Sequence, residues 1–293
     1  IIDLVLDGYE NKNICILFPE LVIEIAEKKW FYYPPTQQEI EEMMKISPFG
    51  MGYRNGIHKE NDFGLKENIS RDYFPASPYN TPILNLLYAS PLKTIKFILK
   101  ILNHATDSYI QSDYVVNNPY IFPADTRSEV YVNMPDGRKI KQHASPTLWM
   151  MFRGTYVAAP YLLQSVLMAL ESYMLFMGEN LSEAEDDEYD KHLEKLWNYC
   201  FEVLLSQSNN VMTGAVLLSV SNAYTKLAGL RIFPLLKIKE IYLWDLHRQV
   251  NESKAYSMMG TEKNAIAHQR LLYNFQKLKH RNKNIQDLVM NLS

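Results

Sequence analysis

The residues best suited to chemistry in this sequence lie in the string WDLHRQV, which holds Asp245, His247 and Arg248 and is followed by Glu252. Asp245 and Arg248 share one face of a helix, so they can form an ion pair. A metal-dependent nuclease or hydrolase needs several carboxylates held together, and only folding could bring others to this one. The simpler interpretation, which we favour, is an intrahelical ion pair beside a buried Trp244.

A second candidate group is Trp149, Arg153 and Gly154 in the string TLWMMFRGT. Arg153 could reach an acid or a phosphate, because a guanidinium binds either of them with paired hydrogen bonds. The simpler interpretation is a helix C-terminus, with the arginine near the negative end of the helix dipole and the glycine as the cap.

Two further segments could form binding surfaces. The basic string KLKHRNK could bind nucleic acid or an acidic partner, but it has no interleaved aromatic residues, so a solvated helix end is favoured. The aromatic-rich stretch 49–79 could instead supply interface anchors. No residue is assigned a catalytic or metal-ligating role. The candidate binding residues are Tyr79, Trp149, Arg153, Asp245, Arg248, Lys279 and Arg281.

Several catalytic motifs are absent from the sequence. None of the 11 glycines is followed by lysine, so the phosphate-cradling P-loop does not occur, and HExxH, GxSxG and CxxC are also missing. We therefore expect no cofactor in this segment. The alternative is a hydrolase or nuclease with a non-contiguous site drawn from Asp245, Arg248, Glu252 and His268.

The composition is that of a globular protein, with 47% hydrophobic and 22% charged residues in a chain of 293. The net charge of -3 supplies no general basic field for nucleic acid. With Cys15 and Cys200 as the only cysteines, we expect no disulfide framework and a cytoplasmic location. The apolar stretch 156–177 is interrupted by Pro160, Gln164 and Glu171, among others, which favours a buried helix over a membrane span. We expect no membrane partner.

Proline and capping signals divide most of the chain into helices. They predict helices over 18–31, 81–89, 91–110, 145–154 and 160–177. The Gly-, Pro- and aromatic-rich stretch 47–80 predicts a long irregular loop. Alternating residues on both sides of the turn Pro135-Asp136-Gly137 predict a small β-hairpin over 129–144.

We therefore predict an all-α, mainly helical fold of degenerate HEAT- or armadillo-like helix pairs, with one small β-hairpin. Its expected parts are N-terminal helices and a long loop (1–128), the hairpin insertion (129–144) and C-terminal helical repeats (145–293). One predicted helix carries a clear apolar stripe that should face a single core. This stripe includes Leu193, Trp197, Cys200, Phe201 and Leu204.

Five strings taken together resemble the helical region of very large bacterial antiphage ATP-binding proteins, the AVAST-type STAND ATPases. The strings are DYFPASPYNTP (72–82), LWMMFRGT (148–155), PYLLQSVLMALE (160–171), WDLHRQV (244–250) and KHRNKNIQDL (279–288). The resemblance implies an extended helical part that senses a phage component or mediates assembly. ATP and Mg²⁺ would be bound by an ATPase domain elsewhere in the full protein, since this chain has no P-loop.

The chain starts with Ile1 and an apolar run, which we interpret as a cut within a larger protein. We expect a helical scaffold or recognition segment, without catalytic activity of its own, whose partner is another protein or other domains of the same protein. The alternatives are the non-contiguous hydrolase or nuclease site around Asp245 and Arg248, and a nucleic-acid binder that uses the basic C-terminal string.

Overall fold

The computed structural model describes residues 2–8, 10–34, 62–66, 72–117, 125–155, 159–183, 188–252 and 263–292, together with residues 38 and 42. The N-terminal helices are α1 (Ile2–Leu6), α2 (Lys12–Leu17), α3 (Pro19–Trp30), α7 (Ile83–Ala89), α8 (Pro91–Gln111) and α9 (Tyr114–Asn117). The strands β1 (Ser128–Asn133) and β2 (Lys139–Ala144) follow. The later helices are α10 (Pro146–Met150), η1 (Met151–Arg153), α11 (Tyr161–Ser182), α12 (Glu188–Ser206), α13 (Met212–Ala223), α14 (Thr225–Ala228), η2 (Gly229–Ile232), α15 (Phe233–Leu236), α16 (Glu240–Glu252), α17 (Lys263–Gln276), η3 (Lys279–Asn282) and α18 (Ile285–Leu292).

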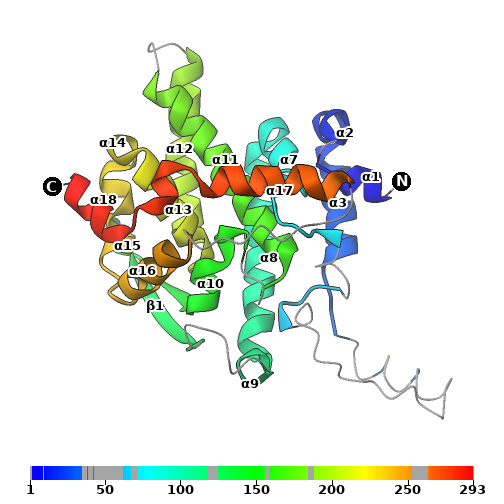
Figure 1. The fold of residues 1–293 in the computed structure, drawn as a ribbon, viewed down its shortest axis with the longest axis horizontal. Helices are drawn as coiled ribbons and strands as arrows, with labels where there is room; N and C mark the ends of the chain where they lie inside the picture. Colours follow the sequence, from blue (N-terminus) through cyan, green and yellow to red (C-terminus); the bar gives the residue numbers. More distant parts are fainter. Residues whose placement is uncertain are drawn as a thin grey trace.

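The all-α prediction with one small hairpin is confirmed for the described residues, where helices predominate and β1 and β2 form a single two-stranded sheet. Consecutive helices pack as pairs, such as α2 with α3, α7 with α8 and α11 with α12. Helix α11 also contacts α7 and α13, so it links the N-terminal helices to the C-terminal ones. The two chain ends lie on opposite sides of the molecule (Figure 1).

Helix α11 lies at the centre of the core, since every residue in its first half is buried and most of them are apolar. By length and composition α11 could span a membrane, but 78% of its most apolar window is buried by other parts of the protein. Burial by protein accounts for its apolar composition, as expected for a core helix. Glu171 in this helix is 0% exposed, and its partners are described below.

The predicted apolar stripe of α12 is confirmed. Leu193, Trp197, Cys200, Phe201 and Leu204 are all buried, while the remaining face carries exposed acidic and basic residues. The Trp197 and Phe201 rings pack with their centroids 5.2 Å apart. Burial raises the pKa of the Cys200 thiol to about 12, so at neutral pH this side chain behaves as a small apolar group.

The β-hairpin forms where the turn residues predict it. Ser128 pairs with Ala144 and Asn133 with Lys139 in an antiparallel register. Gly137 adopts a φ of 88°, a left-handed conformation that costs glycine little. The hairpin is tied to the helices by the Gln142 side chain, which donates to the carbonyl oxygen of Leu205 at 3.1 Å.

The predicted irregular stretch 47–80 lies largely outside the described residues, apart from 62–66 and 72–80. In its last part, Ser77 is fully buried, and its hydroxyl lies 2.6 Å from Nδ1 of His268 on α17. This contact connects α17 to the loop before α7. Helix α17 runs from the middle of the molecule to the N-terminal helices (Figure 1).

Candidate functional site

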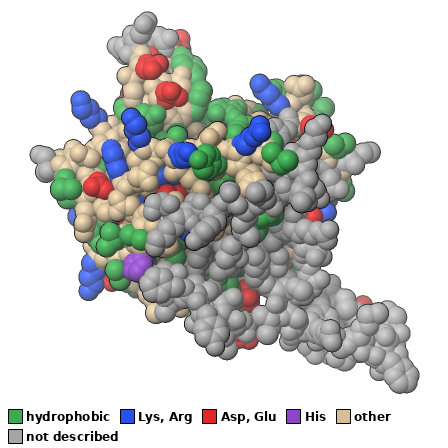
Figure 2. All heavy atoms as spheres, viewed as in Figure 1, with side chains coloured by type: hydrophobic (Ala, Val, Ile, Leu, Met, Phe, Trp, Pro, Cys, Tyr) green, Lys and Arg blue, Asp and Glu red, His purple; other side chains and the backbone are tan. Residues whose placement is uncertain are grey.

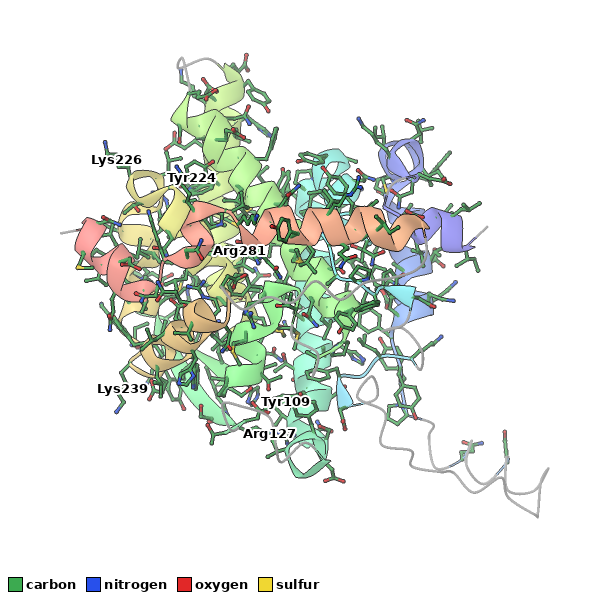
Figure 3. All side chains as sticks on the ribbon, in the orientation of Figure 1. Tyr109, Arg127, Tyr224, Lys226, Lys239 and Arg281 are labelled. Carbon is green, nitrogen blue, oxygen red and sulfur yellow. The ribbon has the colours of Figure 1, made fainter. Side chains whose placement is uncertain are left out.

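Five of the seven candidate binding residues meet inside the protein. Trp149 and Arg153 come from α10 and η1, Asp245 and Arg248 from α16, and Arg281 from η3. None of the five is more than 6% exposed. In Figure 3 the label of Arg281 marks this region, next to the C-terminal end of α17, from which the chain continues into η3. The folded chain therefore joins strings that lie about a hundred residues apart.

Asp245 is the acceptor at one end of this group. Its carboxylate accepts hydrogen bonds from Nε of Arg248 at 2.8 Å, from the indole of Trp149 at 3.3 Å and from the backbone amide of Ile285 at 2.7 Å. The predicted ion pair within α16 is therefore present, and both of its partners are only 1% exposed. Arg248 also donates to the backbone carbonyls of Arg281 and Lys283, which attaches η3 to α16.

The other end is built around Arg281, whose side chain is 0% exposed. Its guanidinium pairs with both oxygens of Glu171 and, at 3.1 Å, with Glu252. It also donates to the backbone carbonyls of Phe152 and Arg153 at 3.1 and 3.2 Å. One side chain thus holds α11, α16 and η1 together.

Arg153 and His280 complete the group. Nε of Arg153 lies 3.2 Å from Glu252, and Nη2 of Arg153 donates to the carbonyl of Asn251 at 2.6 Å. Nε2 of His280 lies 3.2 Å from Glu171, which also accepts a hydrogen bond from the Ser219 hydroxyl at 2.7 Å. We call Arg153, Glu171, Asp245, Arg248, Glu252, His280 and Arg281 the buried ionic network.

Charge in the buried ionic network is balanced, since three carboxylates face three guanidinium groups. Burial by itself disfavours the Glu171 carboxylate, but Arg281 and the hydrogen bond from His280 outweigh it and hold the pKa of Glu171 at about 2. Burial also opposes the charge on Arg248, yet neighbouring Asp245 raises its pKa above the ordinary value. Glu171 and Arg248 therefore keep their charges at neutral pH.

This arrangement positions helices and leaves no carboxylate oxygen open to a ligand. Buried charges are tolerated only where their partners replace water, and each carboxylate here has several donors. Among the residues that the structure describes, no cluster of His, Cys, Asp and Glu is placed to hold a metal ion. The geometry supports a rigid polar core that fixes α16 and η3 on α11.

The remaining predicted residues lie elsewhere. His268, the fourth member of the alternative hydrolase site, pairs with Ser77 and is not part of the buried ionic network. Tyr79 is partly buried next to the core, and Lys279 is exposed. Of the basic C-terminal string, Arg281 and His280 are turned inward, which leaves fewer cations at the surface than the sequence suggests.

Glu171 is central to the network, although no role for it was predicted from the sequence. One signal was present, because Glu171 is the single charged residue in the apolar stretch 160–177. An acid in a helix buried on most sides needs a cation from another element. Nothing in the sequence says which arginine supplies it.

The sequence was also compared with known proteins. No family model matches this chain, and no curated protein matches it.

Proposed function

We propose that this chain is a helical scaffold or recognition segment that binds another protein, and that it has no catalytic activity of its own. One observation carries the proposal: large apolar side chains gather at the surface of α1, α2 and α3. Together they form what we call the N-terminal apolar surface. Its members are 50–68% exposed and comprise Ile2, Leu4, Ile16, Leu17, Phe18 and Leu21.

The helices that carry this surface contact one another, so its side chains belong to one region of the molecule. Scattered single apolar residues are normal on protein surfaces, whereas a group of this kind marks an interaction site. Charged residues at the same helices are already engaged, as Glu20 pairs with Lys93 and Glu27 with Lys100. Protein interfaces usually combine an apolar centre with a polar rim, and these ion pairs supply polar groups on α3.

Helix α16 supports the proposal from the other end of the molecule (Figure 1). Its inner face supplies Asp245, Arg248 and Glu252 to the buried ionic network. Its outer face exposes Leu243 and Val250 at 59% and 49%. Apolar residues at such spacing are those a partner groove or helix recognises. A rigid anchored helix with an apolar outer stripe is well suited to present a recognition surface.

The family resemblance implies what kind of partner the chain binds. The partner would be a phage component or other domains of the same cytoplasmic protein, in which ATP and Mg²⁺ would be bound outside the present residues. The hydrolase alternative is less favoured because Asp245 and Glu252 are buried and paired. The nucleic-acid alternative is less favoured because the Lys and Arg side chains on the face in Figure 2 are separated by neutral and hydrophobic ones.

The test is photo-crosslinking in cells with a photoreactive amino acid at position 17, followed by identification of the captured protein. The proposal predicts one specific partner, whose co-purification is lost in Phe18→Asp. Leu230→Asp is the matched control, because Leu230 is 73% exposed and lies in η2, away from the N-terminal apolar surface. Both variants should have the same melting temperature as the parent chain.

Two results would overturn the proposal. One is a partner that co-purifies equally with Phe18→Asp and with the parent chain. The other is metal-dependent nuclease or ATPase turnover by the purified chain that disappears in a folded Asp245→Asn variant. The second result would promote the hydrolase alternative.

A further inference from the structure

A surface pocket of about 300 Å³ lies between the β-hairpin turn, α12 and the segment formed by η2 and α15. It is distinct from the buried ionic network and from the N-terminal apolar surface. Its floor is apolar and is formed by Met134, Phe201, Leu205 and Pro234. This volume is at the lower end of the range for small-molecule sites, so the pocket suits a compact ligand.

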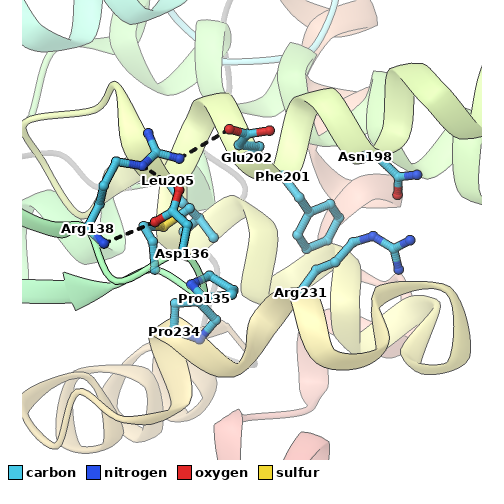
Figure 4. Close-up of a pocket in the computed structure, with 10 residues that line it drawn as sticks. Pro135, Asp136, Arg138, Asn198, Phe201, Glu202, Leu205, Arg231 and Pro234 are labelled. Atoms are coloured by element: carbon cyan, nitrogen blue, oxygen red, sulfur yellow. Dashed lines mark hydrogen bonds and ion pairs between the residues drawn. The ribbon is translucent and has the colours of Figure 1, made fainter.

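The polar residues of the pocket are segregated to its two ends (Figure 4). At one end, Arg138 is neutralised because its guanidinium pairs with Asp136 at 2.6 Å and with Glu202 at 3.2 Å. Two carboxylates share this one cation, so that end repels a further anion. Arg231 and Asn198 lie together at the other end, beyond the ring of Phe201.

Arg231 is the cation in this pocket that is available to a ligand. Its guanidinium donates to the backbone carbonyl of Leu227 at 3.1 Å, and no acidic side chain in the described part of the chain pairs with it. A guanidinium has five N–H donors in a planar fork, which matches the two oxygens of a carboxylate. Most of the donors of Arg231 are therefore open.

Asn198 provides a hydrogen-bond acceptor in the same pocket. Its carboxamide oxygen is buried, and within the described ranges no group donates a hydrogen bond to it. A buried acceptor without a donor costs free energy, and a bound N–H or O–H group would recover it. Asn198 lines the same end of the pocket as Arg231, so a ligand that pairs with Arg231 would lie beside its carboxamide (Figure 4).

We propose that this pocket binds a small organic acid that has an aromatic or branched apolar body and a hydrogen-bond donor beside its carboxylate. The carboxylate pairs with Arg231, the adjacent donor meets the carboxamide oxygen of Asn198, and the apolar body lies over Phe201. Charge fixes the orientation, because the opposite end carries Asp136 and Glu202. A 2-hydroxy acid with an aromatic side chain has these features.

The experiment titrates three matched probes into the full chain and follows the methyl resonance of Met134 by NMR and the heat of binding. The probes are 3-phenyllactate, its neutral amide, and 3-phenylpropionate, which lacks the hydroxyl. We expect saturable binding of 3-phenyllactate at millimolar concentrations or below, weaker binding of 3-phenylpropionate and at least about tenfold weaker binding of the amide.

Two variants and one control assign the contacts. Arg231→Gln should weaken the binding of 3-phenyllactate at least about tenfold. Asn198→Leu should remove the preference for 3-phenyllactate over 3-phenylpropionate. Lys239→Gln, a change at an exposed lysine outside this pocket, should bind as the parent does.

The proposal is overturned if no probe shifts the Met134 resonance saturably, if acid and amide bind equally, or if a folded Arg231→Gln binds like the parent. If Arg231→Gln does not fold, the comparison of the acid with the amide on the parent chain still tests whether the pocket binds a carboxylate. That comparison depends on the charge of the ligand and needs no variant.

Discussion

Glu171→Gln should destabilise the protein at neutral pH by removing one negative charge from the buried ionic network while keeping the shape of the side chain. The glutamine would leave Arg281 with Glu252 as its single carboxylate partner. Three guanidinium groups would then face two carboxylates in a region that is almost entirely buried. Uncompensated buried charge is among the most destabilising defects that a single substitution can produce.

The magnitude follows from the titration of the carboxyl group. Its pKa falls from 4.5 to about 2 in the folded protein, because Arg281 and His280 favour the charged form more strongly than burial opposes it. Each pKa unit corresponds to about 1.4 kcal/mol, so the ionised carboxylate contributes about 3 kcal/mol. Removing one partner of a buried ion pair typically costs a similar 3–5 kcal/mol, which agrees.

The assay is urea unfolding of the parent and of Glu171→Gln as a function of pH. Since the folded pKa of Glu171 is below its unfolded value, the contribution is fully present above pH 4.5 and is lost as the pH falls toward 2. The difference between the two proteins should therefore be about 3 kcal/mol at pH 7 and shrink below pH 4.5. Taking the difference cancels the titration of the other acids.

Glu24→Gln is the matched control for this experiment. Glu24 pairs with Lys28 at 2.7 Å, but both side chains are more than half exposed, so the loss of this pair should leave the unfolding midpoint unchanged. If Glu171→Gln unfolds at the same urea concentration as the parent, or if the difference persists at pH 2, the account of the buried ionic network is wrong.

Three further substitutions test the packing. Burial lowers the pKa of His268 from 6.5 to about 4, so its contribution to stability should fall by up to about 3 kcal/mol as pH drops from 6.5 to 4. In denaturant melts, His268→Gln should remove that part of the pH dependence. Gly154→Ala should lower the free energy of unfolding by about 1–3 kcal/mol more than Gly137→Ala does. Both glycines have a positive φ, but a new Cβ at Gly154 would lie 2.4 Å from Met168. Equal melting temperatures of the two variants would contradict this. Trp197→Ala should lower the free energy of unfolding by about 3–5 kcal/mol, because it removes a large buried side chain. Trp197→Phe should cost much less, because the indole N–H has no hydrogen-bond partner among the described residues. Parent-like melting of the alanine variant would contradict this.

Local sequence signals predicted the features whose causes are local. The hairpin follows from Pro135, Asp136 and Gly137, which set a tight turn between alternating residues. The start of α10 follows from Ser145, whose hydroxyl accepts the amide of Leu148 at 3.2 Å as an N-cap. The end of η1 at Arg153 follows from Gly154, which caps it with a φ of 81°. Each of these depends on residues within one or two turns of the chain.

The buried ionic network could not be predicted in the same way because its pairs cross long sequence distances. The i,i+3 pair of Asp245 and Arg248 was visible, and it is present. The partner of Glu171 lies 110 residues away at Arg281, and that of Arg153 lies 99 residues away at Glu252. Charge balance requires each buried carboxylate to have a cation, but it does not choose among the 30 lysines and arginines.

The same physics explains why residues chosen as a binding surface became part of the core. Arginine and tryptophan are favoured at interfaces because they combine a large apolar surface with hydrogen-bond donors. The same two properties suit a buried polar network, where Arg281 lies against the rings of Phe152 and Phe275 while its donors meet carboxylates. Residue type alone cannot separate these roles; the position of the arginine relative to the core does. Arg231, which no local motif singled out, lies at the surface with open donors, and it is therefore the better candidate for a ligand.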